Sequence, residues 1–168
     1  MSEAIPIKGL HHSAFRCRDS EETREFYEDF LGLPLADAMW LGMTKTERSE
    51  TLLHTFFRLA DGSFIAFFEV PGVPFEFIDQ HDFDLHIALE VEPEYLLFMR
   101  DRAREAGIEC RGPSDHHICE SIYLRDPNGY VIELAVKTSQ HDQAMNPGTN
   151  GARGKLNAWI AAKNATTT

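Results

Sequence analysis

The chain has 168 residues, of which 43% are hydrophobic, and it carries a formal net charge of −11 at pH 7. This is enough apolar material for one packed domain or for two small halves that share a core. The acidic charge argues against nucleic acid or an anionic membrane as a partner, because both are bound by basic patches. No apolar run approaches the roughly 20 residues that a membrane-spanning helix requires.

The cysteines and the N-terminal residues both indicate a cytoplasmic protein. Cys17, Cys110 and Cys119 are odd in number and lack a CxxC spacing, which is typical of reduced thiols and not of disulfides or a zinc site. The first residues show neither a basic start nor an apolar segment, so no secretion signal is predicted.

The first half of the chain combines one predicted helix with several predicted strands. Residues 9–17 predict a strand in which His12 lies on the face opposite the larger apolar side chains. Asp19 predicts the start of a helix, and Gly32 predicts its end. Further strands are predicted at 33–40, 54–59 and 64–70, and a loop is predicted at 44–50.

The second half repeats this order of elements. Residues 84–91 predict a strand that places His86 at the position equivalent to His12. Pro93 suits the first turn of a helix that ends at Gly107. The remaining predictions are a strand at 108–111, a loop at 112–120, and a hairpin over 121–136 whose turn is Asp126-Pro127-Asn128-Gly129.

The repeat predicts an α+β fold built from two tandem βαβββ modules, at residues 8–70 and 83–137. The proline-containing segment 71–82 is the predicted connector between the modules. The last segment, 138–168, predicts a tail with a short amphipathic helix over 152–163.

Three side chains on the less apolar faces of their strands have the chemistry of a metal site. If the modules are related by pseudo-two-fold symmetry, His12 and His86 are counterparts, and Glu133 lies on the equivalent face of the last strand. Two imidazoles and one carboxylate form the facial ligand set that leaves positions open on non-haem Fe(II). Each residue taken alone also fits a hydrogen-bonded or ion-paired structural role. The first module has Ala66 where the second has Glu133, with Glu69 nearby, so three ligands are favoured over four.

Three segments resemble the vicinal oxygen chelate superfamily: Leu10 to Asp19, His86 to Val91, and Ser121 to Glu133. The similarity extends over residues 8–137. This superfamily includes glyoxalase I, methylmalonyl-CoA epimerase, fosfomycin-resistance proteins, bleomycin-binding proteins and type I extradiol dioxygenases. The resemblance implies a strongly curved mixed sheet with the helices outside, and a metal in its cleft at His12, His86 and Glu133.

The residues around the last hairpin favour a ring-cleaving dioxygenase, an oxidoreductase. The extradiol signature is similar to the series His116-x5-Ile122-Tyr123-x2-Asp126-Pro127-x-Gly129-x3-Glu133. The chain departs from the signature just before this series, at Ser114, where the signature has a different small or branched residue. In this hypothesis a catechol-like diol binds Fe(II) beside dioxygen. A neutral His116 or His117 exchanges a catechol proton, and Tyr123 donates a hydrogen bond to a substrate oxygen. Each of these residues also has a purely structural explanation. The two histidines would then be exposed loop residues, and Tyr123 would be a core or strand-edge residue. His54 and Trp40 are weaker candidates for the pocket lining.

Two other functions stay open from the sequence. A metal-dependent isomerase, epimerase or lyase would use the same ligands with Mn(II), Zn(II), Ni(II) or Co(II) to stabilise an enediolate. A non-catalytic resistance protein would only bind a small molecule in the cleft. A fosfomycin-type thiol transferase is disfavoured, because no basic cluster for a phosphonate is evident in so acidic a chain. We expect an aromatic diol-like substrate, dioxygen as its co-substrate, and a homodimer.

Overall fold

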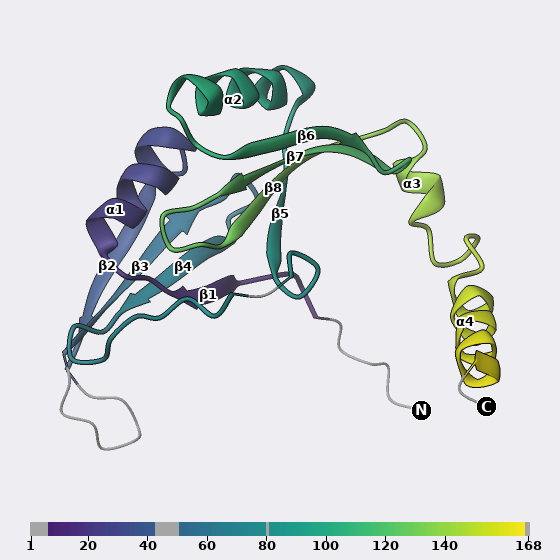
Figure 1. The fold of residues 1–168 in the computed structure, drawn as a ribbon, viewed down its shortest axis with the longest axis horizontal. Coiled ribbons are helices and arrows are strands. Elements are labelled where there is room, and N and C mark those ends of the chain that lie inside the picture. Colours follow the sequence, from purple (N-terminus) through teal and green to yellow (C-terminus); the bar gives the residue numbers. More distant parts are fainter. Residues whose placement is uncertain (1–6, 43–50, 80, 167–168) are drawn as a thin grey trace. The chain divides into compact units, whose positions relative to one another are not determined.

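The computed structural model describes residues 7–42, 51–79 and 81–166, so the loop predicted at 44–50 lies outside the described residues. The elements of the first module are β1 (His12–Arg16), α1 (Ser20–Arg24), the π-helix η1 (Glu25–Phe30), β2 (Leu35–Leu41), β3 (Leu52–Arg58) and β4 (Phe64–Glu69). Those of the second are β5 (His86–Glu90), α2 (Pro93–Glu105), β6 (Cys110–Asp115), β7 (Cys119–Arg125) and β8 (Val131–Lys137). The order βαβββ therefore occurs twice, which confirms the predicted α+β fold of two tandem modules (Figure 1).

Each module has its own four-stranded sheet. The strand order is β1-β4-β3-β2 in the first and β5-β8-β7-β6 in the second. The first sheet is mixed, because β1 runs parallel to β4 while β3 is antiparallel to both β2 and β4. The chain divides into two compact units, one formed by residues 1–86 with 125–131 and the other by residues 87–124 with 132–168. The turn of the β7–β8 hairpin is thus part of the first unit.

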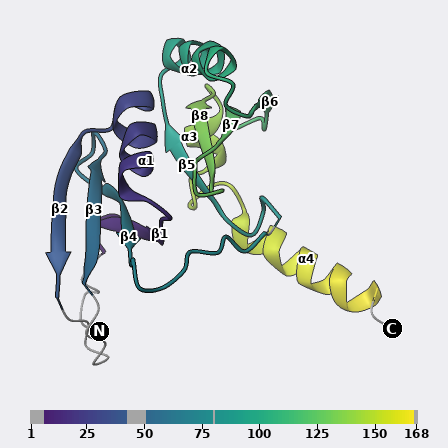
Figure 2. The ribbon, with the colours of Figure 1, turned by 60° about the vertical axis from the view of Figure 1, so that its left-hand side comes forward.

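In the first unit, the helix α1 lies along one side of the sheet (Figure 2). The buried side chains of this unit are largely aromatic. Asp19 caps α1 as predicted, since its side chain accepts hydrogen bonds from the backbone N–H groups of Glu21 and Glu22. On the inner side of the helix, the fully buried ring of Tyr27 stacks on Phe57 with centroids 5.4 Å apart. Burial of these large apolar surfaces is the main contribution to the stability of this unit.

The second unit packs α2 through one apolar stripe. Leu96, Met99 and Ala103 recur at helical spacing and are all buried. Pro93 occupies the first turn, and Gly107 follows the helix with φ +68°, a conformation that favours glycine. Both ends of this helix agree with the sequence prediction.

The prediction of a loop at 112–120 is wrong for most of these residues, because β6 and β7 extend into them. β6 continues to Asp115 and pairs with β7 in antiparallel fashion, with a shift of register between Arg111 and Ser114. Gly112 adopts φ +101° at this bulge and lies against the backbone of Ser121. The bulge interrupts the alternation of side chains, which is why the sequence shows no strand pattern there. His116 and His117 consequently belong to a tight hairpin turn.

The tail contains two helices, α3 (His141–Ala144) and α4 (Ala152–Thr166), the second of which covers the helix expected at 152–163. Its larger apolar side chains, Leu156, Trp159 and Ile160, are exposed. Among the described residues, no helix combines the length and the apolar character needed to cross a membrane.

Candidate functional site

The hydroxyl of Tyr123 lies between a histidine and a carboxylate in the second unit. It is 2.8 Å from Nε2 of His116 and 3.3 Å from Oε1 of Glu133. Tyr123 comes from β7, Glu133 comes from β8, and His116 lies in the turn between β6 and β7. Glu133 is 7% exposed whereas His116 is exposed, so these groups link a buried carboxylate to the solvent. We call them the His116–Tyr123–Glu133 chain.

The phenol in this chain is held in its neutral form. Burial raises the pKa of Tyr123, and the negative charge of Glu133 raises it further. The protonated hydroxyl therefore donates to Glu133, which leaves the phenol oxygen to accept a hydrogen bond from the Nε2–H of His116.

Two neighbouring residues shape this chain in different ways. Arg111 lies opposite Tyr123 in the β6–β7 register, and its guanidinium stands 5.6 Å from the centre of the Tyr123 ring. The sequence alone gives no signal for Arg111, because the bulge in β6 hides the register. His117 has a positive φ of 66°, and its carbonyl accepts a hydrogen bond from Oγ1 of Thr138 at 2.7 Å. Of the two predicted acid–base histidines, His116 is thus the one that contacts Tyr123.

In the first unit, His12 belongs to an aromatic cluster on one face of the sheet. The ring centre of His12 is 6.0 Å from that of His54 and 5.5 Å from that of Phe56. His54 is buried, stacks on Phe68 at 3.7 Å, and places its Nδ1 2.9 Å from the carbonyl oxygen of Phe67. His54 is therefore a stronger lining candidate than its sequence position indicates. Trp40, the other lining candidate, is 82% exposed.

The three predicted ligands have the chemistry that a divalent metal requires. Nδ1 of His86 lies 3.1 Å from the carbonyl oxygen of Asp82, so Nδ1 carries the proton and Nε2 carries the lone pair. Nδ1 of His12 lies 2.8 Å from Nδ1 of His11, so one of these two rings donates a hydrogen bond to the other. The buried Glu133 adds a carboxylate, and this donor set fits Fe(II) and similar ions.

The described structure does not bring these ligands together as one group. Within residues 7–42, 51–79 and 81–166, no three His, Cys, Asp or Glu side chains are gathered so as to hold a metal ion. His12 and His86 belong to the first unit, and Glu133 belongs to the second. The ligand set of His12, His86 and Glu133 therefore stays a prediction.

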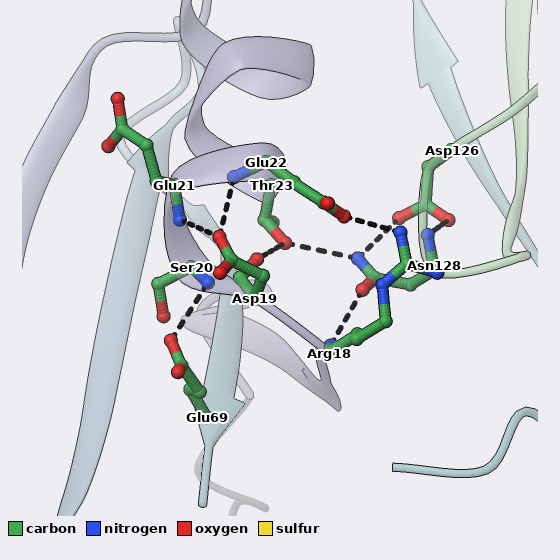
Figure 3. Close-up of polar contacts among 9 residues, drawn as sticks. All are labelled: Arg18, Asp19, Ser20, Glu21, Glu22, Thr23, Glu69, Asp126 and Asn128. Atoms are coloured by element: carbon green, nitrogen blue, oxygen red, sulfur yellow. Dashed lines mark hydrogen bonds and ion pairs between the residues drawn. The ribbon is translucent and has the colours of Figure 1, made fainter. Parts of the chain in front are cut away.

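The nearby carboxylate of the first module has another role. Oε2 of Glu69 accepts a hydrogen bond from the backbone N–H of Ser20 at 2.8 Å, at the first residue of α1 (Figure 3). Ala66, at the position that corresponds to Glu133, is fully buried. The preference for three protein ligands over four stays a prediction from the sequence.

The turn that precedes β8 is anchored by buried polar contacts within the first unit (Figure 3). The Asp126 carboxylate accepts hydrogen bonds from the Tyr27 hydroxyl at 3.1 Å and from the backbone N–H of Asn128 at 2.9 Å. Asn128 in turn accepts from the backbone N–H of Arg18 at 2.9 Å and donates to Oγ1 of Thr23 at 3.2 Å. Burial raises the pKa of Asp126, and these donated hydrogen bonds partly offset the increase. The Asp-Pro-Asn-Gly turn is thus an anchor as well as a reversal of the chain.

Comparisons with known proteins agree with this architecture. The FosX fosfomycin-resistance protein of Listeria monocytogenes, in complex with Mn(II) and sulfate, is 21% identical, with 82% of this chain and 99% of that chain covered and a TM-score of 0.60. FosX of Mesorhizobium loti is 22% identical over 83% of this chain and 99% of that chain, with a TM-score of 0.61. A glyoxylase/bleomycin resistance protein/dioxygenase domain of Frankia sp. EAN1pec is 18% identical. The comparison covers 79% of this chain and 100% of that chain, with a TM-score of 0.64.

These likenesses show a shared fold, and a search of curated proteins found no match. The family assignment comes from the sequence model of the Glyoxalase/Bleomycin resistance protein/Dioxygenase superfamily, which matches residues 9–134 and so covers both modules. The chain belongs to the Glyoxalase/Bleomycin resistance protein/Dioxygenase superfamily.

Proposed function

We propose that this protein is a metal-dependent oxidoreductase that cleaves the ring of a catechol-like substrate, with Fe(II) held by His12, His86 and Glu133. The observation that carries this proposal is the His116–Tyr123–Glu133 chain. It joins two predicted acid–base residues to a predicted metal ligand through contacts of 2.8 and 3.3 Å. A diol needs such groups, because it must lose protons on binding and regain one when the ring opens.

Each residue of the chain has a distinct part in this reaction. The neutral Tyr123 hydroxyl donates a hydrogen bond, either to Glu133 or to an oxygen of the bound substrate. His116 is exposed and contacts the Tyr123 hydroxyl through Nε2, so its ring can relay protons between Tyr123 and solvent. Arg111 over the Tyr123 ring keeps the phenol in place. Fe(II), when bound, supplies a Lewis-acidic and redox-active centre with positions for diol and dioxygen.

A second candidate is a metal-dependent isomerase or epimerase that uses the same ligands with Mn(II), Zn(II), Ni(II) or Co(II). The fold likeness to a FosX protein that contains Mn(II) supports this candidate. The same Tyr123 and His116 would then move a proton on a substrate that forms an enediolate. A chain that only binds a small molecule is the third candidate, and it would need no bound metal.

One experiment distinguishes the three candidate functions. The protein is purified without oxygen, its metal content is measured by elemental analysis, and oxygen uptake is then followed with a panel of catechols. About one iron per chain together with oxygen uptake and a yellow ring-opened product is the expected result. Another divalent metal without oxygen uptake would replace the dioxygenase with the isomerase or epimerase. The lack of any metal after reconstitution would leave a binding protein.

The proposed homodimer and cytoplasmic location both remain predictions from the sequence. Sedimentation of the purified protein tests the first, and the mass of the species in solution decides it. Fractionation of cells that express the protein tests the second.

A further inference from the structure

A cavity of about 610 Å³ lies in the first unit, and none of its lining residues belongs to the His116–Tyr123–Glu133 chain. Arg16 of β1 supplies its one basic side chain, and most of the lining is apolar or aromatic: Pro74, Phe75, Phe77, Ile78 and Tyr130. Cavities of roughly 300–1,000 Å³ with an apolar lining and a few polar groups are typical of small-molecule sites. The lining thus has the composition of a ligand site.

The guanidinium of Arg16 has a hydrogen-bond donor without an acceptor. Its Nη2 donates to the carbonyl oxygen of Val73 at 2.9 Å, which fixes the side chain against the connector. Its Nε is buried and has no hydrogen-bond partner among the residues that the structure describes. A carboxylate is the acceptor that matches a guanidinium best, and Arg16, whose side chain is half-buried, presents its guanidinium group to the cavity lining.

The walls of the cavity are held in place by contacts within the same unit. Phe77 packs against Gly129, where a Cβ atom would lie only 2.9 Å from the ring, and its centre is 5.5 Å from that of Tyr130. Arg125 pairs with Asp82 at 3.2 Å and so ties the far end of the connector to β7. These contacts form the cavity before any ligand arrives, which lowers the entropic cost of binding.

We propose that this cavity binds a small monocarboxylate with an aromatic or aliphatic body. The carboxylate pairs with the guanidinium of Arg16, which lines the cavity, and the body packs between Phe75, Phe77 and Tyr130. The carboxylate of Glu76 also lines the cavity and repels a second negative charge, so a ligand with one anionic group is preferred over a dianion. Binding here requires no metal and is independent of the proposed ring cleavage.

The test measures binding of benzoate, phenylacetate and octanoate by calorimetry, each beside its neutral amide, with phthalate as the dianion. Nuclear magnetic resonance of the labelled full chain locates the site through shifts of backbone amides. The variants are Arg16→Gln, Arg16→Lys and, as a matched control, Arg18→Gln. Arg18 lies two residues further on, has a side chain that is 56% exposed, and pairs with Glu22 outside the cavity.

We expect at least one carboxylate to bind about tenfold more tightly than its amide and than phthalate, with shifts at residues 73–78 and at Tyr130. Arg16→Gln should remove this preference, Arg16→Lys should retain part of it, and Arg18→Gln should leave it unchanged. Equal affinity for acids and amides in the unaltered protein would overturn the proposal. So would shifts located elsewhere, or no binding of any acid at millimolar concentration. These criteria hold even if a variant of Arg16 fails to fold.

Discussion

Nε2 of His116 lies 2.8 Å from the hydroxyl of Tyr123, across the hairpin that β6 and β7 form. The contact places an exposed imidazole on a phenol that burial keeps neutral. It also distinguishes two adjacent histidines that the sequence treats as equivalent.

If this contact serves the proposed reaction, Tyr123→Phe should lower turnover by about 10- to 100-fold, and His116→Ala by about 100-fold or more. The metal content of both variants should stay unchanged, because neither residue is a predicted ligand. Oxygen uptake with the best catechol and elemental analysis are the measurements. His141→Ala is the control, since His141 pairs with Asp142 in the tail. Full activity of both variants would assign the proton transfer to other groups.

The predicted ligands give a separate prediction about metal content. His86→Ala and Glu133→Gln should each abolish stoichiometric metal binding while the circular dichroism spectrum and the melting temperature remain close to those of the unaltered protein. His141→Ala is again the control for the loss of an imidazole. A full complement of metal in purified His86→Ala would exclude His86 as a ligand.

The anchor of the hairpin turn predicts a large effect on stability. Tyr27→Phe removes the hydroxyl that donates to the buried Asp126 and leaves that carboxylate with one donor fewer. The free energy of unfolding should fall by about 1–3 kcal/mol, measured by urea denaturation. A loss well below this range would mean that water replaces the hydroxyl at Asp126.

The raised pKa of Asp126 predicts a dependence on pH. Its folded-state pKa lies above the usual value of 3.8, so the protonated form favours the fold, and this contribution is lost as pH rises from 3.8 through the folded pKa. Asp126→Asn carries no charge and lacks the effect. The stability of the unaltered protein relative to Asp126→Asn should therefore decline as the pH rises above 3.8 in urea denaturation. A difference that grows with pH would contradict the direction of the shift.

The bulge in β6 predicts that a side chain at position 112 destabilises the fold. A Cβ atom there would lie 2.6 Å from the carbonyl oxygen of Ser121, and φ is +101°. Gly112→Ala should destabilise the fold by about 1–3 kcal/mol, measured by thermal unfolding. Gly154→Ala, with open space around the Cβ position in α4, is the matched control. Equal stability of the two variants would show that the hairpin relaxes around the new methyl group.

Local signals in the sequence determined the two modules, the helix starts at Asp19 and Pro93, the stop at Gly107 and the hairpin at Asp126 to Gly129. Caps, turns and alternation act between residues that are close along the chain, so one sequence is enough to predict them. The family resemblance was likewise carried by contiguous segments, and the match over residues 9–134 confirms it.

Only the tertiary structure decided which side chains meet. The bulge at Gly112 sets the register that brings Arg111 to Tyr123 and turns His116 toward the phenol. Strand pairing places His54 beside His12, and the connector encloses Arg16 with one buried N–H unpaired among the described residues. These relationships depend on pairing and packing between distant segments, whose geometry no local pattern encodes.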